Sequence, residues 1–144
     1  MSATLVNPEV KIRVSSVLNK DVKQFGKQHM FDLEDETCWN SDADQSGKPQ
    51  WVMLEFPKPV QIQEIKIRFQ GGFVSQNCCL LGNIAEKKME KIFEFSPEDN
   101  SLLQTFPLSH HVPVTIIRLL FSHSTDFYGR FTVYLLDFIG DVCS

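Results

Sequence analysis

The sequence has no excess of basic residues. Its 144 residues include 14 lysines and arginines against 18 aspartates and glutamates, for a formal net charge of −4. Proteins that bind nucleic acids usually carry a basic patch, because neutralising phosphates supplies much of their affinity. Lys87, Lys88 and Lys91 form the one basic cluster, and Glu86 and Glu90 nearly cancel its charge. Direct binding of DNA or RNA is therefore not expected.

A long hydrophobic run is also missing. No segment approaches the roughly 18 apolar residues that a membrane-spanning helix needs. Lys11 and Arg13 interrupt the N-terminal region in which a secretory signal would have its apolar core. The sequence predicts neither a membrane span nor secretion.

Cysteine is scarce, and its spacing fits no zinc site. The four residues are Cys38, Cys78, Cys79 and Cys143, and the chain has no Asn-X-Ser/Thr sequon. Two disulfides remain possible by number, but reduced thiols in the cytosol or nucleus are the expectation. The adjacent Cys78 and Cys79 would face opposite sides of a strand, so they are interpreted as core thiols and not as one site.

Catalytic patterns are absent too. His29, His110, His111 and His123 have no metal-ligand spacing, and no nearby acid completes a hydrolytic triad. The chain has no phosphate-binding glycine loop, nucleophile elbow or HExxH motif. We therefore expect a protein that is not an enzyme.

The residues that are present describe a folded, aromatic core. Hydrophobic residues make up 42% and charged residues 22% of the chain, and 12 residues are phenylalanine. Such a composition is typical of a globular protein. The length suits a single domain that spans residues 1–144.

Short alternating segments indicate an all-β fold. Strands are expected at residues 10–15, 50–56, 60–70, 78–81, 92–95, 102–108, 114–121 and 130–139, and a helical turn near residues 85–91. Pro57 and Pro59 are expected to end the strand at residues 50–56 and so to separate it from the strand at residues 60–70. About eight strands at such spacing favour an antiparallel β-sandwich or barrel.

Both tryptophans lie in residues 31–56, around which the rest of the fold is organised. An acidic turn at residues 32–36 precedes Trp39, and Trp51 opens a strand that is apolar on both faces. Two-sided apolar character indicates a central strand. We expect both Trp39 and Trp51 in the structural core.

Several of these segments resemble the discoidin, or coagulation factor 5/8 type C, superfamily. That superfamily has a serine-rich first strand, an acidic turn before Thr-x-Trp, and Gln-Trp at the start of the next strand. The matching segments are residues 13–19, 31–32, 37–41 and 50–56. The resemblance implies a galactose-binding-like jelly roll.

Later segments narrow the resemblance to a small intracellular branch of this superfamily. They are residues 69–73, 97–100, 103–107 and 125–130. This branch implies a nuclear or cytoplasmic protein that binds a nuclear receptor and represses its transactivation. The alternative is a lectin-like domain that binds a carbohydrate or lipid headgroup. The secreted members of the superfamily close the domain with a disulfide between cysteines near its two ends. Here Cys143 has no cysteine among the first 37 residues with which to form that disulfide.

The acidic turn offers a candidate metal site. Asp32, Asp35 and Glu36, together with carbonyls of the turn, have the oxygen ligands that calcium prefers. Related domains often carry calcium near this turn, so the resemblance raises the same possibility. The alternative is a solvated acidic turn that caps the region around Trp39, with no cofactor.

Aromatic residues in two loops are the candidate partner-binding residues. Phe73 follows two glycines, and Phe127 and Tyr128 lie in the polar loop at residues 122–129. Exposed aromatics supply contact area at a small entropic cost, whereas buried ones would only fill space beneath their loops. We expect at least one of Phe127 and Tyr128 to be buried. Arg130 either binds a ligand group at the loop end or forms a salt bridge with Asp126.

Overall fold

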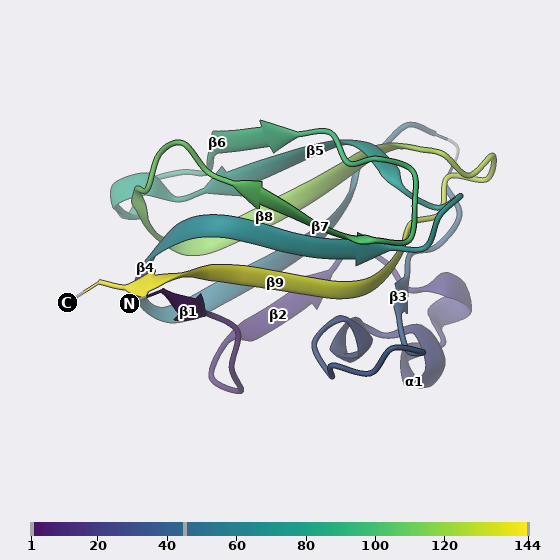
Figure 1. The fold of residues 1–144 in the computed structure, drawn as a ribbon, viewed down its shortest axis with the longest axis horizontal. Helices are drawn as coiled ribbons and strands as arrows, with labels where there is room; N and C mark the ends of the chain where they lie inside the picture. Colours follow the sequence, from purple (N-terminus) through teal and green to yellow (C-terminus); the bar gives the residue numbers. More distant parts are fainter. Residues whose placement is uncertain (1, 45, 144) are drawn as a thin grey trace.

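The computed structural model describes residues 2–44 and 46–143, and in these residues nine strands form an antiparallel β-sandwich (Figure 1). Helical structure is limited to short turns, so the expected all-β class is confirmed. The strands are β1 (Ala3–Thr4), β2 (Lys11–Val14), β3 (Trp39–Asn40), β4 (Gln50–Phe69), β5 (Ser75–Gly82), β6 (Glu90–Phe95), β7 (Leu103–Pro107), β8 (Pro113–Ser124) and β9 (Thr132–Val142). The helical turns are η1 (Leu18–Lys20), α1 (Val22–Phe25), η2 (Lys27–Met30) and η3 (Ile84–Glu86).

Strand β4 is the element shared by both layers of the sandwich. Its first half pairs with β2 and β8, and its second half pairs with β9 and β7. Figure 1 shows the strand turning back on itself at the left end. Pro57 and Pro59 lie in this bend, where the pairing with β8 shifts register between Glu55 and Val60. The prediction of a break there was wrong, because a proline can stay in a strand at a bulge where no ladder hydrogen bond is needed.

The remaining strands extend the two layers. Strands β5 and β6 continue the layer of β8, while β1 and β3 pair with β9 in the other layer. The two terminal strands, β1 and β9, are therefore neighbours, with Ala3 opposite Gly140. Strands β1 and β3 have two residues each, too short for an alternating pattern to be visible in the sequence.

The core between the layers is aromatic, as the composition indicates. Phe121 lies at its centre, with its ring 5.8 Å from Trp39, 5.9 Å from Phe69 and 5.7 Å from Phe131. Trp39 is fully buried, and its indole N–H donates to the backbone oxygen of Ser16 at 2.9 Å. The core position predicted for Trp39 is therefore correct.

Trp51 does not lie in this core. Its neighbours Gln50 and Val52 are buried, but Trp51 itself is half-buried on the outer face of its layer. Successive side chains of a strand point to opposite sides. Because Val52 and Leu54 point into the core, the Trp51 side chain points away from it. The prediction that Trp51 lies in the structural core was therefore wrong.

The helical turns are short, and the one predicted near residues 85–91 is shorter than expected. Helical geometry near residues 85–91 is confined to η3, and strand β6 already begins at Glu90. Within the described residues, no helix combines the length and apolar character that a membrane crossing requires.

Candidate functional site

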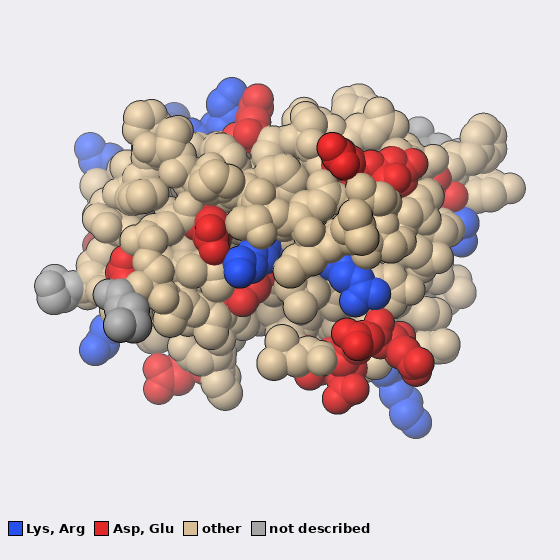
Figure 2. Space-filling model, viewed as in Figure 1, with Lys and Arg blue, Asp and Glu red and all other residues tan. Residues whose placement is uncertain are grey.

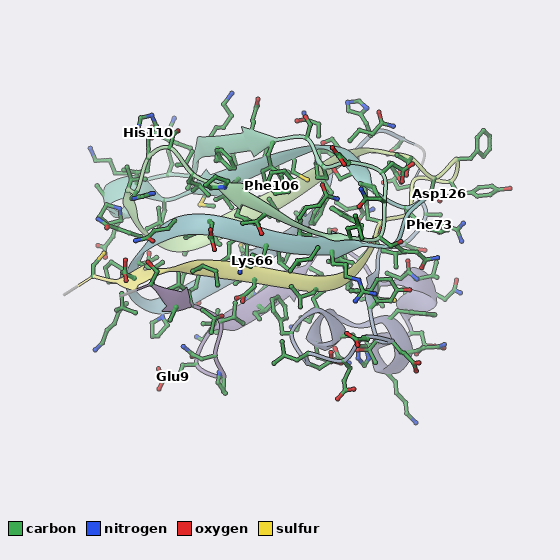
Figure 3. The ribbon with its side chains drawn as sticks, in the orientation of Figure 1. Glu9, Lys66, Phe73, Phe106, His110 and Asp126 are labelled. Carbon is green, nitrogen blue, oxygen red and sulfur yellow. The ribbon has the colours of Figure 1, made fainter. Side chains whose placement is uncertain are left out.

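Four loops meet at one end of the sandwich. Figure 3 places Phe73 and Asp126 together at this end, with His110 at the other. The loop after β4 is joined to the loop before β7, because the Gly72 N–H donates to Asp99 Oδ1 at 2.8 Å. It is also joined to the β8–β9 loop, where the Val74 N–H donates to Thr125 Oγ1 at 3.0 Å. We call this surface the loop end.

The fourth loop, after β3, is attached through a buried serine. The Phe131 N–H donates to Ser41 Oγ, and the Ser41 N–H donates to the Phe131 carbonyl, both at 2.9 Å. Residues far apart in sequence are thus held in fixed positions by hydrogen bonds from backbone N–H groups, mostly to side-chain oxygens, each of which contributes about 1 kcal/mol.

Arg130 and Asp126 form a two-point ion pair in the β8–β9 loop. Nε of Arg130 donates to Oδ2 of Asp126 at 2.9 Å and Nη2 donates to Oδ1 at 3.2 Å. The Arg130 backbone N–H also donates to Oδ2, at 3.1 Å. The hydrogen bond from Arg130 holds the pKa of Asp126 below its usual value, and Asp126 raises the pKa of Arg130. Of the two predicted roles for Arg130, the structure therefore shows the salt bridge.

The same guanidinium orders the aromatic side chains of the loop end. Its central carbon lies 5.1 Å from the ring centre of Phe73 and 5.6 Å from that of Tyr128. Phe127 packs edge-on against Tyr128, with 5.2 Å between ring centres. Because the planar guanidinium of Arg130 lies over both rings, it helps to hold both side chains in place.

Phe127 and Tyr128 are both exposed, by 81% and 54%. The expectation that one of them fills space beneath the loop is therefore wrong. The reason is that Phe131 and Phe121 already fill the core below the loop. Phe73 is half-buried against Arg130, so it belongs partly to the surface and partly to its support.

Two leucines enlarge this surface and were not singled out from the sequence. Leu102 and Leu103 are 68% and 52% exposed, where the loop that Asp99 and Ser101 fasten to Gly72 and Gly71 leads into β7. The one available signal was a pair of leucines directly after a polar turn, without alternation. They are thus further exposed apolar residues at the loop end, in addition to the two aromatic residues.

The acidic turn does not gather its carboxylates. Asp32 accepts hydrogen bonds from Thr37 Oγ1 at 2.6 Å and from the Glu34 N–H at 3.0 Å, and its Oδ2 lies 3.2 Å from His29 Nδ1. Burial opposes ionisation of Asp32, but these hydrogen bonds outweigh it and lower its pKa. The hydrogen bond to the Lys23 carbonyl raises the pKa of His29, and Asp32 adds to this effect.

Asp35, the second predicted calcium ligand, lies near an arginine of strand β4. Asp35 is exposed, and its Oδ1 lies 3.7 Å from Nη1 of Arg68. Figure 2 shows acidic side chains gathered at the lower right, over the segment that contains this turn. Residues 2–44 and 46–143 contain no group of three or more His, Cys, Asp or Glu side chains able to hold a metal ion. Asp32, Asp35 and Glu36 thus do not supply a side-chain ligand set, and calcium binding there stays a prediction.

The four cysteines are free thiols. Cys78 is buried, and burial raises the pKa of its thiol to about 12. Cys79, on the opposite face of β5, is half-buried, as strand alternation predicts. A thiol with so high a pKa is almost wholly protonated near neutral pH and is a poor nucleophile.

Comparison with known proteins gives the family directly. No family model matches the chain. A zebrafish protein (Danio rerio) named nuclear receptor 2C2-associated protein is 48% identical over 98% of each chain. The human protein (Homo sapiens) of the same name is 47% identical, over 98% of this chain and 99% of its own. This chain belongs to the nuclear receptor 2C2-associated protein family.

Solved structures show the fold of this family in proteins of distant sequence. A factor 5/8 type C domain from Bacteroides fragilis covers 99% of the chain with a TM-score of 0.83 and 11% identity. A family 32 carbohydrate-binding module from Clostridium perfringens, solved with galactose, covers 96% with a TM-score of 0.78 and 15% identity. The predicted galactose-binding-like β-sandwich fold is therefore confirmed.

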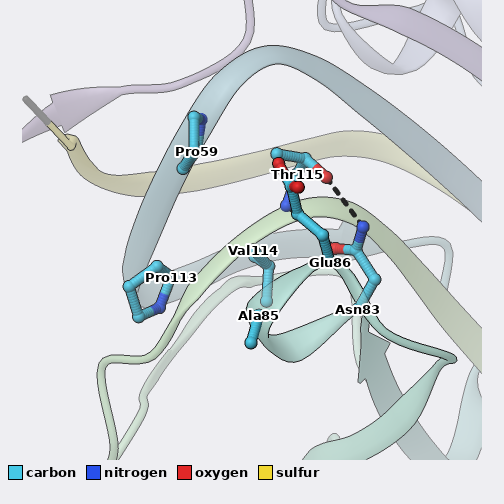
Figure 4. A pocket seen from close by; sticks show the side chains of 7 residues that line it. All are labelled: Pro59, Asn83, Ala85, Glu86, Pro113, Val114 and Thr115. Atoms are coloured by element: carbon cyan, nitrogen blue, oxygen red, sulfur yellow. Dashed lines mark hydrogen bonds between the residues drawn. The ribbon is translucent and has the colours of Figure 1, made fainter.

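A cavity of about 310 Å³ lies at the end of the sandwich opposite the loop end (Figure 4). Asn83 borders it and is buried, and its Nδ2 donates to Thr115 Oγ1 at 2.7 Å. Its Oδ1 accepts from the backbone N–H groups of Thr115 and Ile116 at 2.9 and 2.8 Å. Both the nitrogen and the oxygen of this amide therefore help to hold η3 to β8, which indicates a structural role.

Proposed function

We propose that this chain is a non-catalytic binding module that associates with a nuclear receptor through its loop end. The name of its relatives, nuclear receptor 2C2-associated protein, supports this class of partner. The observation that supports this surface is the exposed Phe127–Tyr128 pair, which the Arg130–Asp126 ion pair holds in place. Exposed aromatic residues on a rigid support lose little entropy on binding and are frequent hot spots of protein interfaces.

The proposed consequence of binding is repression of the receptor's transactivation, in the nucleus. Occupying a surface of the receptor needs no catalysis by the bound module. Microscopy of a fluorescently tagged chain, in cells with and without the receptor, tests whether the protein is in the nucleus, in the cytoplasm or in both.

The test is a binding titration of purified nuclear receptor 2C2 with wild type and the double variant Phe127→Ala/Tyr128→Ala. We expect the variant to bind about 10-fold more weakly or worse, because it loses the apolar contact area. Its melting temperature should stay close to that of wild type, since both side chains are exposed. A receptor-driven reporter gene should lose repression in parallel.

Val142→Ala is the matched control. Val142 is also exposed, but it lies at the opposite end, paired with Val60 in the β4–β9 ladder. Its substitution should leave receptor binding unchanged. Equal affinity of wild type and the double aromatic variant would exclude the loop end as the receptor surface.

Lectin-like binding at the loop end is the second candidate. An exposed aromatic ring is a platform on which the apolar face of a sugar packs, and Tyr128 offers one. Against this, Asp126 already engages the guanidinium of Arg130, which leaves fewer donors for hydroxyl groups. Glycan-array binding that is lost on Tyr128→Ala or Phe73→Ala would favour this candidate over receptor binding.

A further inference from the structure

The outer face of the β2–β4–β8–β5 layer carries large apolar side chains around one arginine. Val52, Ile117 and Leu80 are fully buried, so the residues next to them in each strand point outwards. All of these outward residues are half-buried, because they shield one another. We call this set the outer patch: Trp51, Met53, Leu81, Ile116, Arg118 and Leu120.

The strand register places Arg118 at the centre of the outer patch. Met53 lies opposite Arg118 on one side, and Leu81 lies opposite it on the other. The guanidinium carbon lies 5.0 Å from the ring centre of Trp51. Its Nη2 donates to the thioether sulfur of Met53 at 3.7 Å, which is a weak acceptor.

Arg118 has no carboxylate partner among the described residues. Its Nε is buried, and within residues 2–44 and 46–143 it has no hydrogen-bond acceptor. An unsatisfied N–H of a charged group is costly, at about 1–3 kcal/mol or more. A guanidinium whose best acceptor is a thioether therefore retains most of its capacity to bind an acid.

Two other arginines stack on aromatic rings and differ in this respect. Arg68 lies over Tyr134 at 4.9 Å and has Asp35 at 3.7 Å. Arg130 lies over its rings with Asp126 at 2.9 Å. In the described part of the chain, Arg118 is thus the stacked arginine that lacks an acid.

A second arginine without a partner stands beside it. Arg13 on β2 pairs with Met53, so Met53 lies between Arg13 and Arg118 on adjacent strands. Neighbouring strands are about 4.8 Å apart, which separates the two arginine Cα atoms by about 10 Å. Arg13 is exposed and, like Arg118, makes no ion pair within the described residues. Among the described residues, two guanidiniums without a carboxylate partner thus lie on adjacent strands of one face.

We propose that the outer patch docks an extended, acidic segment of a protein partner. Carboxylates on alternate residues of such a segment are about 7 Å apart, within reach of both Arg13 and Arg118. A large apolar side chain of the same segment packs on Trp51 and Met53. This surface is separate from the loop end, and the proposal does not depend on the function assigned there.

Charge at the margin of the outer patch favours a peptide over a polyanion. Glu55 lies next to Lys11, at 3.9 Å, and Glu94 next to Lys91, at 3.1 Å. A continuous row of phosphates on nucleic acid or on a membrane would meet these glutamates and the net negative charge of the chain. A peptide can place single carboxylates opposite the two arginines alone.

The experiment selects peptides of 12 residues from a random display library on the immobilised full chain. We expect selected peptides to be enriched in Asp and Glu and to bind at least 10-fold more weakly to Arg13→Gln/Arg118→Gln. Their affinity should fall as salt is raised. In a nuclear magnetic resonance titration, the selected peptide should shift the indole signal of Trp51 and leave that of the buried Trp39 in place.

Arg68→Gln is the matched control, because it also removes a guanidinium stacked on a ring but lies on the other layer. It should retain binding within about twofold. If Arg118→Gln unfolds the protein, the single variant Arg13→Gln replaces it in the test. Arg13 is exposed, so this variant should fold and should still bind the selected peptides more weakly than wild type. Selected peptides without acidic enrichment, or with equal affinity for the double variant, would overturn the proposal. So would a dimer in sedimentation that Arg118→Gln converts to monomer, since a second copy would then occupy the face.

Discussion

Asp126 and Arg130 are joined at three points, through two guanidinium nitrogens and one backbone N–H. Because the backbone contact closes the turn, the ion pair fixes the loop as well as the side chains. Tyr128 and Phe73 then stack against a guanidinium that cannot rotate freely. The exposed aromatic surface is therefore as rigid as this pair.

The pair makes stability depend on pH. The pKa of Asp126 in the folded state lies below that of an unfolded aspartate, which is about 3.9. The contribution of Asp126 to the free energy of unfolding is therefore complete above the unfolded pKa, and it is lost as pH falls through the lowered, folded-state pKa. Asp126→Asn should lower the free energy of unfolding by about 1.5–3 kcal/mol at pH 7 and by less below pH 4. Urea unfolding at pH 7, 5, 4 and 3 measures this gap. Asp35→Asn, a change at an exposed carboxylate, should show almost no gap; a gap for Asp126→Asn that is independent of pH would contradict the assignment.

The two tryptophans should respond differently to the same substitution. Trp39→Phe removes a buried hydrogen bond to Ser16 and leaves a cavity beside Phe121, so we expect a loss of about 2–4 kcal/mol. Trp51→Phe, on the outer face, should cost about 1 kcal/mol or less. Unfolding followed by circular dichroism compares them without relying on tryptophan fluorescence. Equal losses would mean that the burial of the two indoles is not as described.

Gly129 permits the tight return of the aromatic loop. Its φ is +79°, and a Cβ there would lie 2.2 Å from the Asp44 carbonyl oxygen. Gly129→Ala should therefore cost more than the roughly 1 kcal/mol of left-handed strain alone. Gly72→Ala is the control, because Gly72 has φ +91° but open space around it. Thermal melting of the two variants measures the difference, and similar melting temperatures would show that the contact with Asp44 yields easily.

Calcium removal tests the acidic turn. Asp32 is already engaged by Thr37, Glu34 and His29, and Asp35 faces Arg68. Because these side chains are already engaged, we expect the melting temperature to change by less than about 1 °C with chelator or with millimolar calcium. A calcium ion that bound only the folded state would raise the melting temperature. A drop on chelation that added calcium reverses would show that backbone carbonyls complete a site there.

Much of the fold could be predicted because its signals are local. The alternation in β8 and β9 and the Thr-x-Trp segment around Trp39 depend on near neighbours in sequence. The bend at Pro57 and Pro59 could not be predicted, because whether a proline ends a strand depends on which partner strand needs its N–H. The same holds for Phe127 and Tyr128, whose exposure follows from how Phe131 fills the space below them.

The sequence by itself determined an antiparallel sandwich or barrel with an aromatic core, since a period of two over about eight short segments favours these two architectures. Only the tertiary structure decided which arginines have acids. Asp126 and Arg130 are close in the chain, but Arg68 finds Asp35 across the fold and Arg118 finds none in the described residues. Pairing between distant side chains depends on strand register and loop packing, and no local pattern encodes either.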